Sequence, residues 1–141
     1  MKKILAILIF LLLIVVIVVY QYNLYKVQAL RNQKLNEEYE MFTKGEILGT
    51  SLITLINKAI DNNQKNDIQL DENKLYMNDK HNSIRIEVKF AESDEIYSME
   101  SIAKLGSEQF IKNYATMTFK CIEKLYHEKT NIIKYMLFEQ I

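Results

Sequence analysis

Residues 4–22 read Ile-Leu-Ala-Ile-Leu-Ile-Phe-Leu-Leu-Leu-Ile-Val-Val-Ile-Val-Val-Tyr-Gln-Tyr, and no charged side chain occurs between Lys3 and Lys26. A helix rises 1.5 Å per residue, so roughly 20 apolar residues are needed to cross a hydrocarbon core about 30 Å thick. The stretch just reaches that length. We therefore expect residues 1–22 to form a transmembrane anchor that contacts membrane lipid through residues 4–22.

The charges around this stretch predict its orientation. Lys2 and Lys3 precede it, whereas the basic residues that follow it are diluted by acidic ones. This contrast favours a single-pass signal-anchor in the cell membrane, with a cytoplasmic N-terminus and the rest of the chain extracytoplasmic. A cleaved secretory signal is the alternative, because Val27-Gln-Ala29 has the small-x-small form of a cleavage site. Against it, the apolar run is longer than the usual core of about 7 to 15 residues.

The anchor has the composition of a lipid-facing tether. Its residues 4–22 contain no Gly, Ser, Thr, Asn or charged residue, and Ala6 is their one small side chain. Close packing between transmembrane helices uses small or polar residues, and a transport path uses ionisable ones. We therefore do not expect a pore or a receptor bundle.

Residues 23–44 are polar and contain neither Gly nor Pro, which predicts that the helix continues as an amphipathic stalk. A helix over residues 4–44 would be about 60 Å long. Five apolar side chains fall near one face of this stalk and form a possible partner-packing face: Leu24, Val27, Leu35, Tyr39 and Phe42. This face packs either on the chain's own domain or on neighbouring copies.

Residues 45–141 are long enough for one small extracytoplasmic domain. Gly45 and Gly49 bracket a break, after which Thr50 or Ser51 caps a second helix that ends at Asp61-Asn62-Asn63. Short strand candidates follow at residues 68–70 and 75–77, and residues 83–90 alternate apolar and charged side chains as a half-buried strand does.

A further helix is predicted over residues 98–114, capped by Ser98 and weakened by Gly106, and two strands are predicted over residues 116–126 and 132–140. The order α-α-β-β-β-α-β-β indicates an α+β fold: a transmembrane helix extended into a stalk, then an antiparallel sheet with two helices on one face. Periodicity predicts a common core: Leu52, Leu55, Ile56, Ile60, Ile84, Ile86, Val88, Ile102, Leu105, Phe119 and Cys121.

The sequence offers no set of residues for catalysis. His81 and His127 both fall in predicted turns, where we expect surface histidines, and neither has a second ligand at metal-binding spacing. Cys121 is the one cysteine and is expected in a strand face beside Met117 and Phe119. Glycine-rich phosphate loops and nucleophile motifs are missing from the sequence. We expect no enzymatic activity and no catalytic, cofactor-binding or metal-binding residues.

The charge balance argues against nucleic acid as a partner. The chain has 18 basic and 18 acidic residues without a dense basic cluster. A nucleic-acid binder usually presents a basic face.

The layout resembles that of type IV pilins and the pseudopilins of related secretion systems. A short positive N-terminus, an uninterrupted apolar helix, an amphipathic stalk and a small domain ending in antiparallel strands carry this resemblance. The family's processing Gly and the Glu five residues into the mature helix have no counterpart in Met1-Lys-Lys-Ile-Leu-Ala6, which does not favour prepilin processing.

Two functions follow as hypotheses. The first is a pilin-like structural or accessory component of a bacterial surface filament or secretion apparatus, which would self-assemble or bind protein partners through the stalk. The alternative is a membrane-tethered extracytoplasmic binding or sensory module that does not self-assemble.

Overall fold

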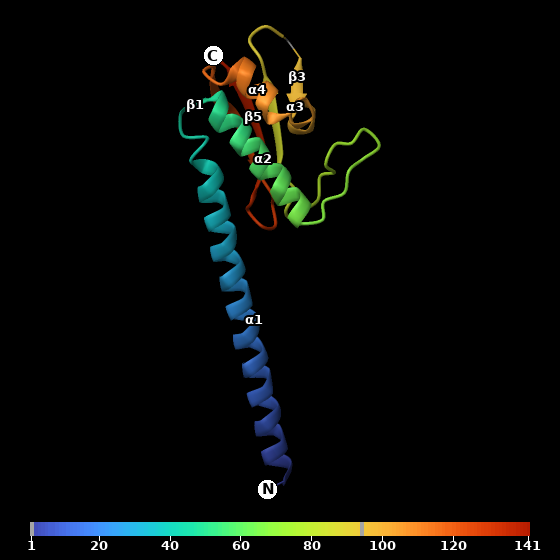
Figure 1. Cartoon of the computed structure of the whole chain (residues 1–141). Coiled ribbons are helices and arrows are strands. Elements are labelled where there is room, and N and C mark those ends of the chain that lie inside the picture. Colours follow the sequence, from blue (N-terminus) through green and yellow to red (C-terminus); the bar gives the residue numbers. More distant parts are fainter. Residues whose placement is uncertain (1, 94) are drawn as a thin grey trace. The chain divides into compact units, whose positions relative to one another are not determined.

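The computed structural model describes residues 2–93 and 95–141, and the chain divides into two units, one ending at Lys34 and one comprising Leu35–Ile141. The first unit is helical throughout its described part. Its helix α1 (Lys2–Glu40) begins in the first unit, and the last residues of this helix, from Leu35 on, belong to the second unit (Figure 1). An α+β fold with a long apolar N-terminal helix is therefore confirmed.

The second unit contains the sheet and three further helices. In chain order its elements after α1 are β1 (Glu46–Leu48), α2 (Gly49–Lys65), β2 (Arg85–Lys89), β3 (Ile96–Ser98), α3 (Met99–Leu105), α4 (Ser107–Tyr114), β4 (Thr118–Tyr126) and β5 (Ile133–Gln140). Strands β1 and β3 were not expected from the sequence, since a strand of three residues is too short to show a period of two.

The sheet is mixed, so the prediction of an antiparallel sheet is only partly right. Its strand order is β1-β4-β5-β2-β3, and all neighbours are antiparallel except β2 and β5. The parallel pair places Ile86 opposite Met136 and Val88 opposite Phe138. The parallel pair arises because β5 lies between β4 and β2. The hairpins β2–β3 and β4–β5 are each antiparallel, but local periodicity does not show how the two hairpins are arranged in the sheet.

Helix α2 lies over one face of the sheet and supplies much of the core (Figure 1). The predicted stripe is confirmed for Leu52, Leu55, Ile56 and Ala59, which are fully buried, whereas Ile60 is partly buried. The predicted Thr50 or Ser51 cap is wrong, because the helix begins at Gly49 directly after β1. A Cβ at position 49 would lie 1.9 Å from the Tyr114 carbonyl oxygen, so this close approach requires glycine.

Asn63 lies inside α2 and does not end it, contrary to expectation. Its side chain is fully buried and bonds both backbone groups of Ile84: its Nδ2 donates to the carbonyl at 2.8 Å, and its Oδ1 accepts from the amide at 2.9 Å. A buried amide with both ends paired costs little, and it joins the last turns of α2 to the residue that precedes β2.

The strands predicted at residues 68–70 and 75–77 do not form. One isolated bridge joins Leu70 to Tyr76. Between them the Asp71 carboxylate accepts from the amides of Asn73 and Leu75, both at 2.9 Å, so local side-chain bonds replace a strand ladder. The resulting connection between α2 and β2, residues 66–84, is here named the α2–β2 loop.

The predicted helix over residues 98–114 is two helices. Ser98 caps α3, as expected, by accepting from the Ser101 amide at 3.2 Å. Gly106 has a φ of 87°, a left-handed value that ends α3 and redirects the chain into α4.

The core prediction is confirmed for eight positions, which are Leu52, Leu55, Ile56, Ile84, Ile86, Val88, Ile102 and Phe119. Ile60 and Cys121 are partly buried. The prediction is wrong for Leu105, whose side chain is 59% exposed. Leu105 ends α3 just before the break, and Phe110 of α4 takes the inward position. Met117 is also exposed and precedes β4, so Phe119 alone of its predicted strand face is fully buried.

Candidate functional site

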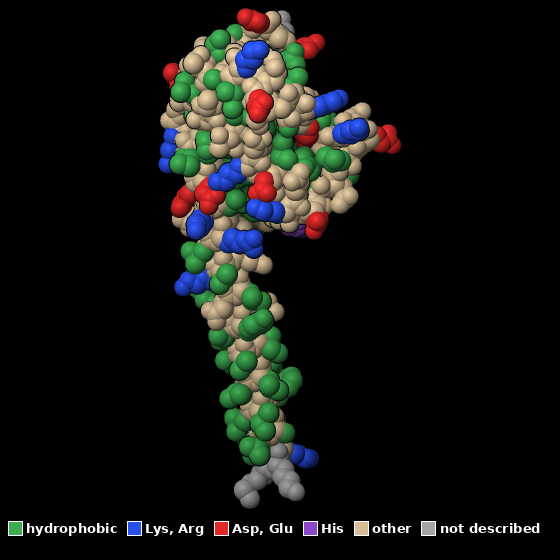
Figure 2. Space-filling view, in the orientation of Figure 1, with side chains coloured by type: hydrophobic (Ala, Val, Ile, Leu, Met, Phe, Trp, Pro, Cys, Tyr) green, Lys and Arg blue, Asp and Glu red, His purple; other side chains and the backbone are tan. Residues whose placement is uncertain are grey.

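The first unit exposes an unbroken apolar segment, residues 4–19, ahead of its polar part. Every large hydrophobic side chain described between Ile4 and Val19 is at least 42% exposed, and Figure 2 shows hydrophobic side chains along this helix. Among the described residues α1 is the one helix long and apolar enough to span a membrane.

The predicted stalk face divides into an exposed and a buried part. Leu24 and Val27 are 43% and 64% exposed. Leu35 and Phe42 are partly buried against the core, and Tyr39 is completely buried in it. The far part of the predicted face therefore packs on the chain's own domain. The helix also ends at Glu40, so the predicted extension to residue 44 is wrong and Phe42 lies in the following turn.

Polar contacts hold the end of α1 in the second unit. Asn36 Nδ2 donates to the Asn131 carbonyl at 2.6 Å, and Asn36 Oδ1 accepts from the Ile133 amide at 2.9 Å. The Tyr39 hydroxyl donates to the Lys58 carbonyl at 3.2 Å. Burial, and then the nearby Glu38 carboxylate, raise the pKa of Tyr39 above its usual value, so the hydroxyl remains a donor. This end of α1 is thus an integral part of the fold.

The sheet face opposite the core, here named the outer face, carries a row of alternating charges. Glu46 of β1 pairs in register with Lys120 of β4, which pairs with Glu139 of β5. Glu139 also forms an ion pair with Lys89 of β2, with 3.1 Å between Lys89 Nζ and Glu139 Oε1. Ion pairs with this exposure contribute about 0 to 1 kcal/mol each to stability. The row of charges therefore affects the choice of binding partner more than it affects the stability of the fold.

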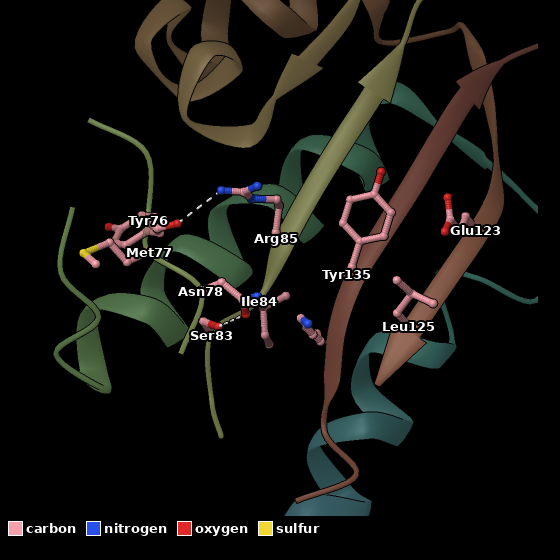
Figure 3. Close-up of a pocket in the computed structure, with 10 residues that line it drawn as sticks. Tyr76, Met77, Asn78, Ser83, Ile84, Arg85, Glu123, Leu125 and Tyr135 are labelled. Atoms are coloured by element: carbon pink, nitrogen blue, oxygen red, sulfur yellow. Dashed lines mark hydrogen bonds between the residues drawn. The ribbon is translucent and has the colours of Figure 1, made fainter. Parts of the chain in front are cut away.

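A pocket of about 310 Å³ opens at the end of the outer face where β2 begins. The α2–β2 loop forms one wall and β4 the other, and Arg85 and Tyr135 lie between them (Figure 3). We name it the β2–β5 pocket; its lining is Tyr76, Met77, Asn78, Ser83, Ile84, Arg85, Glu123, Leu125, Lys134 and Tyr135.

The basic groups of this pocket are held by neutral oxygens. Arg85 Nη2 donates to the Tyr76 carbonyl at 3.4 Å, shown as a dashed line in Figure 3. With the Asn78 amide oriented to suit its neighbours, its oxygen accepts from Lys134 Nζ at 3.3 Å. Among the described residues neither cation forms a salt bridge. The pocket therefore suits an anionic group.

The Tyr135 hydroxyl donates to the Glu87 carboxylate at 2.8 Å. Burial, then this bond, raise the pKa of Tyr135. The hydroxyl therefore stays neutral and donates to Glu87, which lies on the same face of β2 as Arg85.

Asp79 shapes the wall that the α2–β2 loop contributes. Burial by itself would raise its pKa, but bonds from the amides of Ser83, Asn82 and His81 and from the Ser83 hydroxyl outweigh burial and lower the pKa to about 2. The three amide bonds are 2.7 to 3.0 Å long.

Asp79→Asn is expected to destabilise the protein by about 1 kcal/mol at pH 7, a value reduced for solvent screening of this partly exposed group. Because the folded-state pKa is lowered from 3.8 to about 2, the stabilisation by the carboxylate is complete above about pH 5 and is lost as the pH falls through 2. Urea unfolding at pH 7, 5 and 3 should show the gap between wild type and variant shrinking with acid. Glu72→Gln, an exposed change in the same loop, should show no such gap; an equal gap at every pH would contradict the assignment.

A second hollow, of about 630 Å³, lies at the opposite end of β2 and is walled by aromatic side chains of the core edge. Phe90 meets Tyr97 edge-on at 5.3 Å and stacks obliquely on Tyr114 at 4.6 Å. These contacts close the end of the core beneath α3 and α4.

The described residues bring together no group of three or more metal-ligating side chains. His81 is exposed as predicted, but His127 is only 4% exposed, so the expectation of a surface residue there is wrong. Its Nε2 lies 2.7 Å from the Ser83 carbonyl, because the β4–β5 turn folds back against the α2–β2 loop. Cys121 is half-buried, and burial raises the pKa of its thiol, which makes it a poor nucleophile.

Sequence reasoning did not find the β2–β5 pocket. Arg85 was placed on the wet face of a strand, and Lys134 in a strand, but their proximity depends on the parallel pairing of β2 with β5. The one available signal was the alternation in β2, which put Arg85 outward.

No family model, no curated protein and no solved structure matches this chain. The fold and its exposed helix define an α+β chain with one N-terminal helix that could span a membrane.

Proposed function

We propose that this protein is a single-pass, pilin-like structural or accessory subunit of a bacterial surface filament or secretion apparatus. One observation carries the proposal: the apolar segment and the core residue Tyr39 belong to the same helix. The apolar segment is thus joined to the second unit through one helix, so contacts between the apolar segments of neighbouring copies would also bring their domains near one another. A binding module needs only a flexible tether to its membrane.

Exposed apolar residues beyond the membrane-spanning length support the proposal. Leu24, Val27 and Leu30 are 43%, 64% and 58% exposed in the otherwise polar part of α1. Apolar side chains grouped on a surface commonly mark a protein contact. Leu24 and Val27 belong to the predicted partner-packing face, and they remain available after Tyr39 has been buried.

The alternative, a membrane-tethered binding or sensory module, is favoured by a different observation. The β2–β5 pocket holds Arg85 and Lys134 without salt bridges among the described residues. A small anionic ligand bound there by monomers would support this alternative.

Cysteine crosslinking in intact membranes tests the proposal. In a full-length Cys121→Ser background, Leu24→Cys and Val27→Cys should each give disulfide-linked dimers on mild oxidation. Tyr22→Cys, 64% exposed and on the other side of the helix, is the matched control and should crosslink much less. Equal crosslinking at all three positions would indicate random collision, and its absence at all three would refute self-assembly through the stalk.

The proposed location is the cell membrane, with the N-terminus cytoplasmic and the anchor retained. A thiol reagent that cannot cross membranes should therefore label Asn78→Cys, in the same Cys121→Ser background, in whole cells, because Asn78 is exposed in the second unit. Mass spectrometry of the mature protein should find Met1 or Lys2 at its start. Labelling only after lysis would reverse the orientation, and a start at Leu30 would show cleavage.

A further inference from the structure

The two ends of β2 carry opposite charges. Arg85 and Lys134 line the β2–β5 pocket where the strand begins. Beyond its other end, the turn that leads to β3 exposes Glu92 and Glu95; Figure 1 shows it as the yellow loop before β3. We name Glu92, Glu95 and the adjoining Ile96 the acidic tip.

The pocket provides the complement of a carboxylate beside an apolar side chain. Its two cations are partnered by the neutral oxygens of Tyr76 and Asn78, and Glu123 is the one carboxylate among its ten lining residues. Leu125 and Met77, both about half exposed, supply apolar surface beside the cations. A volume near 310 Å³ accommodates a side chain of the size of glutamate or isoleucine together with water.

The acidic tip has the matching chemistry, two carboxylates beside an exposed apolar side chain. The Ser93 amide donates to the Phe90 carbonyl at 3.2 Å, and the Ser93 hydroxyl accepts from the Glu95 amide at 3.0 Å. Ile96, which follows Glu95, is 53% exposed at the start of β3. Neither Glu92 nor Glu95 forms a salt bridge with a described residue.

The tip and the pocket of one molecule cannot meet. They lie at opposite ends of β2, and five residues of strand span about 17 Å. A charge-complementary contact between them therefore requires a second copy.

From the proposed self-assembly, on which this inference rests, and from this charge complementarity, we infer that the acidic tip of one copy docks in the β2–β5 pocket of the next. Glu95 approaches Arg85 and Lys134, and Ile96 packs toward Leu125 and Met77. The two surfaces differ, so the contact is head-to-tail, and it continues from copy to copy unless the rotation closes a ring.

The test uses two full-length chains, both Cys121→Ser and carrying different tags, expressed together in membranes. One contains Met77→Cys beside the pocket, and the other contains Ile96→Cys at the tip, which leaves Glu92 and Glu95 in place. Oxidation should yield a disulfide joining the two tags. Ile96→Cys with Gln109→Cys, an exposed control position on α4, should not.

Charge exchange tests the mechanism. Adding Arg85→Glu and Lys134→Glu to the pocket chain should abolish the crosslink, and adding Glu95→Lys to the tip chain should restore it. Restoration also shows that the reversed pocket chain is folded. The inference would be overturned if the crosslink yield were the same with and without these charge changes. It would also be overturned if the crosslink formed with a different protein in place of the second copy.

The same membranes separate this inference from the proposed function. If Leu24→Cys and Val27→Cys give dimers while the tip–pocket pair does not, the stalk assembles and the head-to-tail contact is wrong. If none of these positions crosslinks copies, both proposals are refuted.

Discussion

Ile86→Asp is expected to unfold the second unit. Ile86 is fully buried in β2, between β3 and β5, and lies opposite Met136 in the parallel pair. A carboxylate there would have no partner within the core, and burying an unpaired charge costs several kcal/mol. That cost is comparable to the whole stability of a small domain, about 5 to 15 kcal/mol.

Circular dichroism of the full-length chain in detergent measures this effect, since loss of the sheet and of α2 to α4 leaves only the helical signal of α1. Ile122→Asp is the matched control: it makes the same chemical change in the same sheet at a side chain that is 51% exposed. The control should melt close to wild type. If Ile86→Asp does the same, the placement of β2 in the core is incorrect.

Tyr39→Ala is expected to destabilise the second unit by about 3 to 5 kcal/mol, the usual cost of removing a large buried aromatic side chain. Tyr39 is fully buried, and the Lys58 ammonium lies 5.4 Å from the centre of its ring. The substitution also leaves the Lys58 carbonyl without its side-chain donor. Urea unfolding followed by circular dichroism should show the loss, while Met41→Ala, at a side chain 67% exposed, should stay within about 0.5 kcal/mol of wild type.

The same contact predicts where a soluble fragment has to begin. Residues 35–141 include the buried part of α1, whereas residues 45–141 lack Tyr39 and the two bonds of Asn36. We expect cooperative unfolding from the longer fragment and a much weaker transition from the shorter one. Equal stability of the two fragments would show that α1 is not part of the core.

Local patterns in the sequence predicted the elements whose neighbours in the chain determine their structure. The alternation from Ile84 to Phe90, the stripe of α2 and the β4–β5 hairpin depend on side chains a few residues apart, and each was found. The long apolar segment was also found from local sequence, because length and apolar composition are all that is needed to recognise a helix that could span a bilayer.

Features that depend on long-range packing were missed. The position of β5 beside β2 makes the sheet mixed, brings Lys134 near Arg85 and creates the β2–β5 pocket. His127 was assigned to the surface because its turn looked exposed, and the Ser83 carbonyl that buries it comes from a loop 44 residues earlier. Gly49 resembled a loop residue, but its role is to admit the Tyr114 carbonyl.

The partner-packing face shows both what local spacing predicts and what it cannot predict. Helical spacing correctly grouped Leu35 and Tyr39 on one side of α1, but it could not say which protein covers them. The structure assigns these two to the chain's own core and leaves Leu24 and Val27 exposed. The self-assembly proposal therefore depends on a shorter segment than the sequence suggested.

Counting the copies in each membrane particle tests self-assembly most directly. The full-length chain, labelled with one dye at its exposed C-terminal Ile141, would be captured from membranes in lipid particles at low density and followed by stepwise photobleaching. We predict several bleaching steps in most particles, and fewer when Leu24 and Val27 are both replaced by serine. Single steps throughout, equal to those of an unrelated single-pass control, would contradict the account.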